Sequence, residues 1–424
     1  MTDIFFPSVS ERIIEHKLPN GLTIRVIPRS GFARKYAFFA TNYGSIDTSF
    51  TLNGQHICTP DGVAHYLEHK MFDLPRGNAM QEFAARGANP NAFTSYAITA
   101  YYFDCTDCFE DNLKLLLEFV STPYFTQESV EKEQGIIAQE ILMYEDAPSS
   151  QVYEQLFAAM YEHHPVRVPI AGTVESIAQI TAQTLETCHK AFYNPTNMCL
   201  CVMGDVDAET VFAIAEQMLP ASSSPIAERD YGPDETLECN GLRVHRQMEV
   251  AMPTFMLGFK CQPPANGQDV LRRELLGDLA AELLMGEASP LYARLYEKGL
   301  IDPSFGVGYE SMRGVGLLVA SGDSNDPEAV TTAILDECAR LSREGADPAL
   351  FLRLKRSMLG RRLRDLDSFE SVCFRQCSYL FDGAEYFEFP ELCEALTLED
   401  TLDFLTHTVT EAHSGLSVIS PLEE

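Results

Sequence analysis

Apolar positions in the first half of the chain follow the strand period in some segments and the helix period in others. Four runs rich in β-branched and aromatic residues predict strands, at 16–30, 35–46, 91–105 and 194–204. The first run contains the turn signal Pro19-Asn20-Gly21. Apolar residues three and four positions apart predict helices at 62–72, 79–86, 109–121 and 127–145.

The second half repeats this order after a break in composition. Residues 219–240 hold three consecutive serines and three prolines without apolar periodicity, which predicts a linker. Strand-like runs then alternate with helical segments, with strands at 242–250, 253–261 and 314–324 and helices at 268–298, 326–343 and 347–365. We therefore expect an α+β fold of two similar domains related by internal duplication, at 1–218 and 241–424, each a mainly antiparallel sheet packed against helices.

Charge and hydropathy restrict the possible partners and compartments. The 424 residues include 62 Asp and Glu against 31 Lys and Arg, a net charge of -31 that repels phosphate backbones, so we expect no nucleic-acid partner. The surplus serves solubility or concentrates cationic peptides. No apolar run reaches the ~20 residues of a membrane span. The opening "MTDIFFPSVSERII" lacks the pattern of a secretory signal, so we expect a cytoplasmic protein with no membrane contact.

Twelve cysteines lie along the chain without the density of a disulfide scaffold. Two close pairs stand out, Cys105 with Cys108 and Cys199 with Cys201, and neither has a second pair at zinc-ribbon spacing. We interpret the cysteines as reduced structural thiols, with a redox or metal role as the alternatives.

The predicted helix at 62–72 carries candidate metal chemistry in "HYLEH". His65 and His69 are four residues apart, so one helix face presents both imidazoles, and Glu68 lies beside them. A catalytic zinc needs three protein ligands and an open position for water. The alternative is an amphipathic helix that happens to carry polar residues. In either case we expect Tyr66, Leu67 and Met71 in the core.

A third ligand is available on the predicted helix at 127–145. Glu133 and Glu140 are two turns apart and share a face. We expect a buried face formed by Ile136, Ile137, Ile141 and Leu142. A carboxylate on such a face needs a partner or a metal, and Glu140 fits this better than Glu133, which lies in a run of charges. We interpret the other candidate histidines as surface or structural residues: His163, His164 and His189.

The order His-x-x-Glu-His is the inverzincin signature. Here the chain resembles the pitrilysin, insulin-degrading enzyme and mitochondrial processing peptidase family of zinc metallopeptidases. The resemblance extends over nearly the whole chain, through "GVAHYLEHKMF", "GANPNAFTSYAITAYYF", "VEKEQGIIAQEI", "FYNPTNMCLCVMGDVD" and "SPLYARLYEKGLI".

The resemblance implies a role for each polar residue. His65, His69 and Glu140 would bind one Zn²⁺ per chain, and Glu68 would be the general base that activates the zinc-held water. Glu133 would orient a histidine or water from outside the ligand set. Asn91 and Ala92 would lie on an edge strand that pairs with the substrate backbone.

One departure from the family pattern concerns the second half. Family members that act alone usually carry Leu-Arg-x-x-x-Leu-x-Tyr, whose Arg and Tyr contact the substrate. Here Tyr296 and Asp302 occupy those positions, and Arg294 lies two residues early. The chain resembles the zinc-bearing member of two-subunit bacterial relatives, in the subgroup associated with elongation factor P modification. We therefore expect a homodimer, or a heterodimer with a paralogous subunit that supplies Arg and Tyr.

Three functions remain open from the sequence. The presence of all five expected polar residues favours a zinc-dependent endopeptidase that hydrolyses peptides or unfolded segments. The second is a catalytically silent peptide-binding or structural subunit of a processing-peptidase-like complex. The third is a metal protein of another class, which the extended resemblance disfavours.

Overall fold

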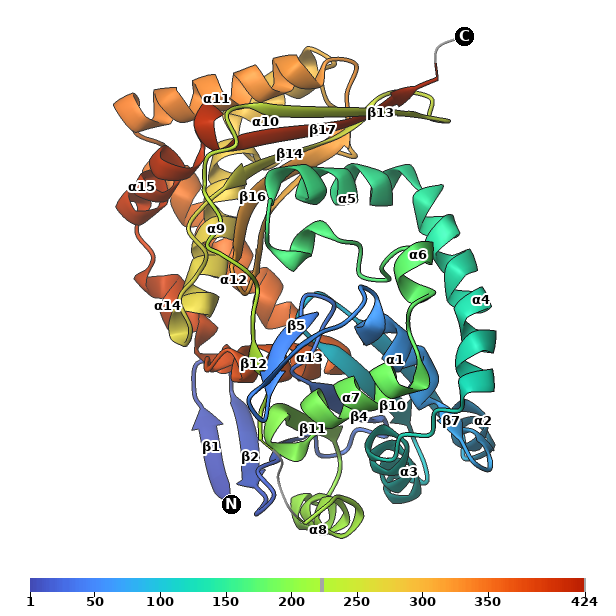
Figure 1. Cartoon of the computed structure of the whole chain (residues 1–424). Coiled ribbons are helices and arrows are strands. Elements are labelled where there is room, and N and C mark those ends of the chain that lie inside the picture. The colour runs from blue at the N-terminus through green and yellow to red at the C-terminus, as the bar shows by residue number, and fades with distance from the viewer. Residues whose placement is uncertain (222–224, 423–424) are drawn as a thin grey trace.

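Two sheets, one from each half of the chain, form the frame of the molecule (Figure 1). A computed structural model describes residues 1–221 and 225–422. The predicted α+β class is confirmed, because helices pack against both sheets. The three serines of the predicted linker, 222–224, lie outside the described residues.

The first half forms a seven-stranded sheet. Its strands in spatial order are β1 (Thr2–Phe6), β2 (Glu11–Lys17), β3 (Thr23–Pro28), β11 (Met198–Gly204), β4 (Lys35–Thr41), β10 (Thr99–Cys105) and β9 (Ala88–Thr94). β3 and β11 run parallel and the other neighbours are antiparallel. Short strands form two small sheets, β12 (Glu228–Arg229) with β5 (Ser49–Leu52) and β6 (Gln55–Cys58), and β7 (Asp73–Leu74) with β8 (Gly77–Asn78).

The second half forms a five-stranded sheet with the same topology as the last five strands of the first. Its spatial order is β13 (Leu242–Met248), β17 (Ser414–Pro421), β14 (Thr254–Lys260), β16 (Val315–Asp323) and β15 (Gly306–Met312). β13 and β17 are parallel and the remaining pairs antiparallel, as in β3–β11–β4–β10–β9. The shared strand order and direction agree with the predicted duplication.

The described helices of the first half are α1 (Val63–Met71), α2 (Ala79–Ala85), α3 (Phe109–Ser121), α4 (Gln127–Glu145), α5 (Pro148–Met160), α6 (Val174–Ile177), α7 (Ala182–Phe192) and α8 (Ala208–Met218). The first four correspond to the four predicted helices, and α3 and α4 match to the residue. α4 begins where the Thr126 side chain accepts a hydrogen bond from the Ser129 N–H. On α4, Ile137 and Ile141 are buried as predicted, but Ile136 and Leu142 are exposed, so its apolar face is narrower than predicted.

The helices of the second half are longer on average than those of the first. They are α9 (Gln268–Met285), α10 (Pro290–Glu297), α11 (Pro327–Glu344), α12 (Pro348–Asp365), α13 (Phe369–Phe381), α14 (Phe389–Ala395) and α15 (Leu398–Thr408). The predicted segment 268–298 is two helices, because Ser289 caps the start of α10. Among the described helices, none has both the length and the apolar character that a membrane crossing requires.

One helix of each half packs against the sheet of the other half. α5 lies against the second sheet, where Leu156 and Met160 pack on Leu317 and Ile419 (Figure 1). A Cβ at Gly415 of β17 would lie 2.8 Å from Met160, so this glycine permits the close approach of α5.

The exchange is reciprocal, because α13 packs against the first sheet. Its buried Cys373 and Cys377 adjoin Cys199 and Cys201 of β11 within one apolar cluster. All twelve cysteines are free thiols, and of the close pair in β10 and the following turn, Cys105 is buried and Cys108 exposed.

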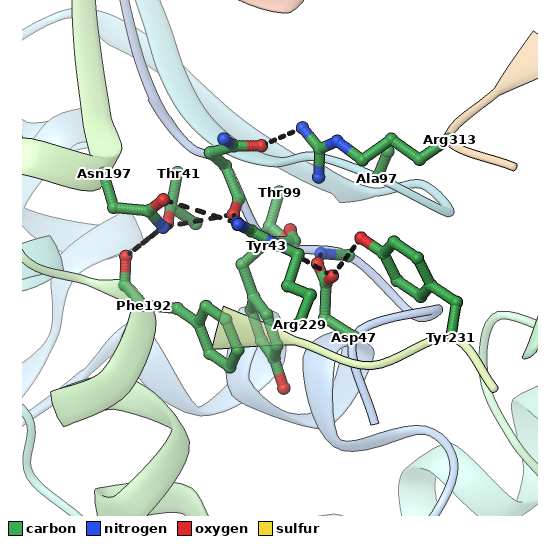
Figure 2. Close-up of polar contacts among 12 residues, drawn as sticks. Thr41, Tyr43, Asp47, Ala97, Thr99, Phe192, Asn197, Arg229, Tyr231 and Arg313 are labelled. Carbon is green, nitrogen blue, oxygen red and sulfur yellow. Dashed lines mark hydrogen bonds and ion pairs between the residues drawn. The ribbon is translucent and has the colours of Figure 1, made fainter. Parts of the chain in front are cut away.

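A buried network of hydrogen bonds and an ion pair connects the predicted linker to the first half (Figure 2). Asp47, fully buried, accepts hydrogen bonds from Arg229 Nε at 2.9 Å and Tyr231 Oη at 2.8 Å. Arg229 also donates to the backbone carbonyl of Asn42. From the second half, Arg313 donates to the Asn42 side chain and so joins the same network.

Candidate metal centre

Helix α1 holds the two predicted histidines in a fixed position against the core. Gly62 precedes the helix with φ +89°, and a Cβ there would lie 2.4 Å from the Ala171 carbonyl oxygen, so glycine is required. Tyr66, Leu67 and Met71 are buried, as predicted. The opposite face of α1 therefore presents the polar side chains of the motif towards α4.

The structure brings His65, His69 and Glu140 together with ligand atoms within 4.8 Å of one another. We call these three residues the metal group. His65 Nε2 lies 3.6 Å from Glu140 Oε1, and His69 Nε2 lies 3.4 Å from Glu140 Oε2. Ligand atoms at ~2.1 Å around a tetrahedral zinc are about 3.4 Å apart. The two separations between the histidine nitrogens and the Glu140 oxygens are close to this value, so the three side chains fit a zinc ion.

Glu133 lies behind this set, as the resemblance implies. Its Oε1 is 3.1 Å from His69 Nδ1, the ring nitrogen that faces away from Glu140. Such a carboxylate fixes the ring and its tautomer. His65 Nδ1 is buried and has no hydrogen-bond partner among the described residues.

The carboxylates of the site favour a positive charge between them. Burial lowers the pKa of His69, but hydrogen bonds to Glu133 and Glu140 outweigh it and raise the pKa to about 10. Hydrogen bonds to His65 and His69 hold the pKa of Glu140 well below its usual range. The hydrogen bond to His69 likewise lowers the pKa of Glu133. Without metal, a protonated His69 balances the carboxylates, and a divalent cation would replace that proton.

Glu68 occupies a different position from the three ligand candidates. Thr94 Oγ1 on β9 donates to Glu68 Oε2 at 2.7 Å, which directs the carboxylate towards the edge strand. Burial raises the pKa of Glu68. Glu68 is outside the metal group but borders the same cleft, as expected of a base.

Two further residues of the site, Thr94 and Tyr144, were not predicted from the sequence. Thr94 lies within the quoted edge-strand motif, so the motif itself held the signal. Tyr144 Oη donates to Glu140 Oε1 at 3.3 Å, and its position one turn after Glu140 was the available sign. Both side chains line the cleft.

The metal group lies in an open cleft of about 950 Å³. Its walls come from α1, β9, α4, the start of α5, the loop 169–173, and Arg246 of β13. β9 is the edge of the seven-stranded sheet, and the Ala92 N–H donates to the Asn91 side chain at 2.9 Å rather than to another strand. The expected position of Asn91 and Ala92 on an edge strand is therefore observed, while their contact with substrate remains a prediction.

The second-half residues at the Arg and Tyr positions do not line this cleft. Tyr296 is half-exposed on α10 and stacks on Tyr292. Asp302 accepts hydrogen bonds from Ser304, and Arg294 pairs with Glu337.

The three other candidate histidines have surface or structural positions. His189 is buried and its Nε2 is 3.0 Å from the Val120 carbonyl oxygen. His164 is buried and its Nδ1 accepts the Val166 N–H. His163 is at the surface.

The fold and the site together define an α+β protein of two similar halves with a candidate zinc centre in the first, and comparison with known proteins identifies its family. Residues 58–174 match the model of the insulinase peptidase family M16, and residues 179–358 match that of the peptidase M16 inactive domain. The chain is 36% identical to the uncharacterised zinc protease YmfH of Bacillus subtilis, over 96% of both chains. The chain belongs to the M16 peptidase family.

Solved structures support the same assignment. An M16-like peptidase structure from Alicyclobacillus acidocaldarius matches with a TM-score of 0.93 and 33% identity, over 99% of this chain and all of that one. Pitrilysin matches with a TM-score of 0.77 and 16% identity, over all of this chain and 47% of its own, and this likeness shows the fold alone.

We expect the chain to bind one zinc ion and to lose it when Glu140 is changed. Zinc at 100 times its Kd should stabilise the folded state by about 2.7 kcal/mol. Glu140→Gln should weaken zinc binding by more than about a hundredfold, the most that loss of an outer hydrogen-bond partner costs. Metal content and thermal unfolding with and without zinc are the measurements. Glu145→Gln, on the same helix and cleft wall, is the matched control and should bind zinc normally.

Proposed function

We propose that this M16 chain is a zinc-dependent endopeptidase that hydrolyses peptides or unfolded segments. The observation that carries the proposal is the metal group of His65, His69 and Glu140 beside Glu68, on one cleft wall with an edge strand. The open cleft accepts an extended chain but has no room for a folded domain.

Each polar residue of the site has a separate role in the proposed hydrolysis. When bound, zinc would supply Lewis acidity to the scissile carbonyl and to the attacking water. Glu68 takes the proton of that water and passes it to the leaving amine, and Thr94 holds the carboxylate in position for both transfers. Glu133 keeps His69 in place, and β9 offers backbone groups to the substrate as an added strand.

We propose that a second chain supplies the hydrogen-bond donors that stabilise the oxyanion formed during hydrolysis. Tyr296 and Asp302 stand where active relatives resembling this chain have Arg and Tyr, and neither lines the cleft. A homodimer or a heterodimer with a paralogous subunit would complete the site and enclose the cleft. The assignment to the subgroup associated with elongation factor P modification rests on sequence resemblance and is part of this proposal.

Peptide hydrolysis by the purified chain, alone and mixed with a paralogous chain encoded nearby, tests the proposal. We expect zinc-dependent cleavage of internally quenched peptides that rises strongly in the mixture. Full activity of the chain alone would contradict the partner requirement. No zinc-dependent cleavage in either sample would instead favour a silent peptide-binding subunit.

A further inference from the structure

Arg246 is a basic side chain placed in a cleft whose other charged walls are acidic. It projects from β13 of the second sheet, yet lines the same cleft as the metal group. The carboxylates that share the cleft are Glu68, Glu140, Glu145 and Glu154. Among the described residues, no other Lys or Arg lines this cleft.

The Arg246 guanidinium is held in place by a neutral partner. One of its nitrogens donates to the Gln151 side-chain carbonyl. The Gln151 amide is buried and its nitrogen donates to the Tyr144 carbonyl at 3.2 Å and to Glu154 at 3.0 Å. Gln151 therefore has a fixed orientation, and so does the side of Arg246 that it binds.

The rest of the guanidinium is free of protein carboxylates. Within the part of the chain that the structure describes, no carboxylate lies within ion-pair distance of Arg246, and Glu154 binds Gln151 instead. The neighbouring Arg243 on the same strand is paired with both Glu328 and Glu411. An arginine has five N–H donors, so most of those of Arg246 remain available in the cleft.

We propose that Arg246 is an anion subsite of the cleft that recognises a carboxylate of the peptide substrate, either an acidic side chain or the C-terminal carboxylate. This inference rests on the proposed peptidase function. A guanidinium with free donors matches a carboxylate in charge and in geometry. The subsite is contributed by the second half of the chain, whereas the metal group comes from the first.

The position of Arg246 sets where the carboxylate lies along the substrate. Tyr144 is one helical turn, about 6 Å, beyond Glu140, and Gln151 and Arg246 follow Tyr144. Arg246 is therefore separated from the metal group by Tyr144 and Gln151, so the recognised carboxylate lies away from the scissile bond, and the peptide scan below locates it.

Binding of labelled peptides to the zinc-loaded Glu68→Gln chain tests the subsite without turnover. The peptides carry Glu or Gln at one position, scanned along the sequence, and end in a free acid or an amide. At one position, the carboxylate form should bind about five- to tenfold more tightly than its neutral twin. Higher salt should reduce this preference, because the cleft is open to solvent.

Substitutions of Arg246 distinguish recognition from a structural role. Arg246→Gln should remove the preference and leave affinity for the neutral peptide unchanged, and Arg246→Glu should favour Lys at the same position. Arg243→Gln, on the same strand outside the cleft, is the control that should retain it. Equal weakening of both peptides by Arg246→Gln, or no preference in the parent chain, would overturn the inference. A preference without zinc-dependent cleavage by the wild-type chain, either alone or mixed with the paralogous chain, would refute the peptidase proposal and leave the subsite standing.

Discussion

Glu68→Gln should lower peptide hydrolysis by at least about a thousandfold while one zinc ion per chain stays bound. The amide has nearly the same shape and can still accept the hydrogen bond of Thr94 Oγ1, but it cannot take a proton from water. The ligand atoms of His65, His69 and Glu140 are unaffected, because Glu68 lies outside that group.

Initial rates with quenched peptides, measured together with metal content, test this expectation. Thr94→Val is the companion variant, since it keeps the carboxylate and removes only the hydrogen bond that orients it. We expect a partial loss there, about tenfold, from a less well-positioned base. Loss of zinc in Glu68→Gln would mean that Glu68 is a ligand, and substantial remaining activity would exclude it as the base.

Asp47→Ala should destabilise the protein by about 3–5 kcal/mol, the cost of removing one partner from a buried ion pair. Asp47 is fully buried and binds Arg229, Tyr231 and the Gly44 N–H. Without the carboxylate, the Arg229 charge stays in a mostly buried site, beside the Phe192 ring and with the Asn42 carbonyl and the Asn197 side-chain oxygen as acceptors. The linker should also detach from the first half.

Urea unfolding and limited proteolysis measure these two effects. Asp47→Asn should cost less, because an amide oxygen can still accept from Arg229 and Tyr231. Asp3→Ala breaks an exposed ion pair with Arg12 and should change the free energy of unfolding by less than about 1 kcal/mol. If Asp47→Ala is no less stable than Asp3→Ala, the network does not hold the halves together.

Local sequence signals were sufficient for the elements that carry the metal group. The predicted ranges of α3 and α4 agree with the structure to the residue, because the apolar period marks both helices and Thr126 caps the start of α4. The pairing of α1 with α4 followed from the expectation that a carboxylate on an apolar face needs a partner, although Ile136 and Leu142 are exposed and Glu140 is only partly buried.

Long-range packing was beyond the reach of those signals. An amphipathic helix shows which of its faces is buried but not which sheet covers it, so the exchange of α5 and α13 could not be predicted. Arg246 reaches the cleft only because α5 crosses to the second sheet and brings Gln151 beside β13. Asp47 and Arg229 are 182 residues apart, and no local pattern relates them.

Because of the reciprocal helix exchange, the duplicated half of the chain is not the unit that folds. A duplication produces two copies of one topology, and each copy alone would be expected to close its own core. Here Leu156 and Met160 complete the core of the other copy, and Cys373 and Cys377 do the same in return. Either half without its counterpart would expose both a bare sheet face and an apolar helix. The metal cleft, whose walls include α5 and Arg246 of β13, is consequently a property of the joined pair and not of the first half alone.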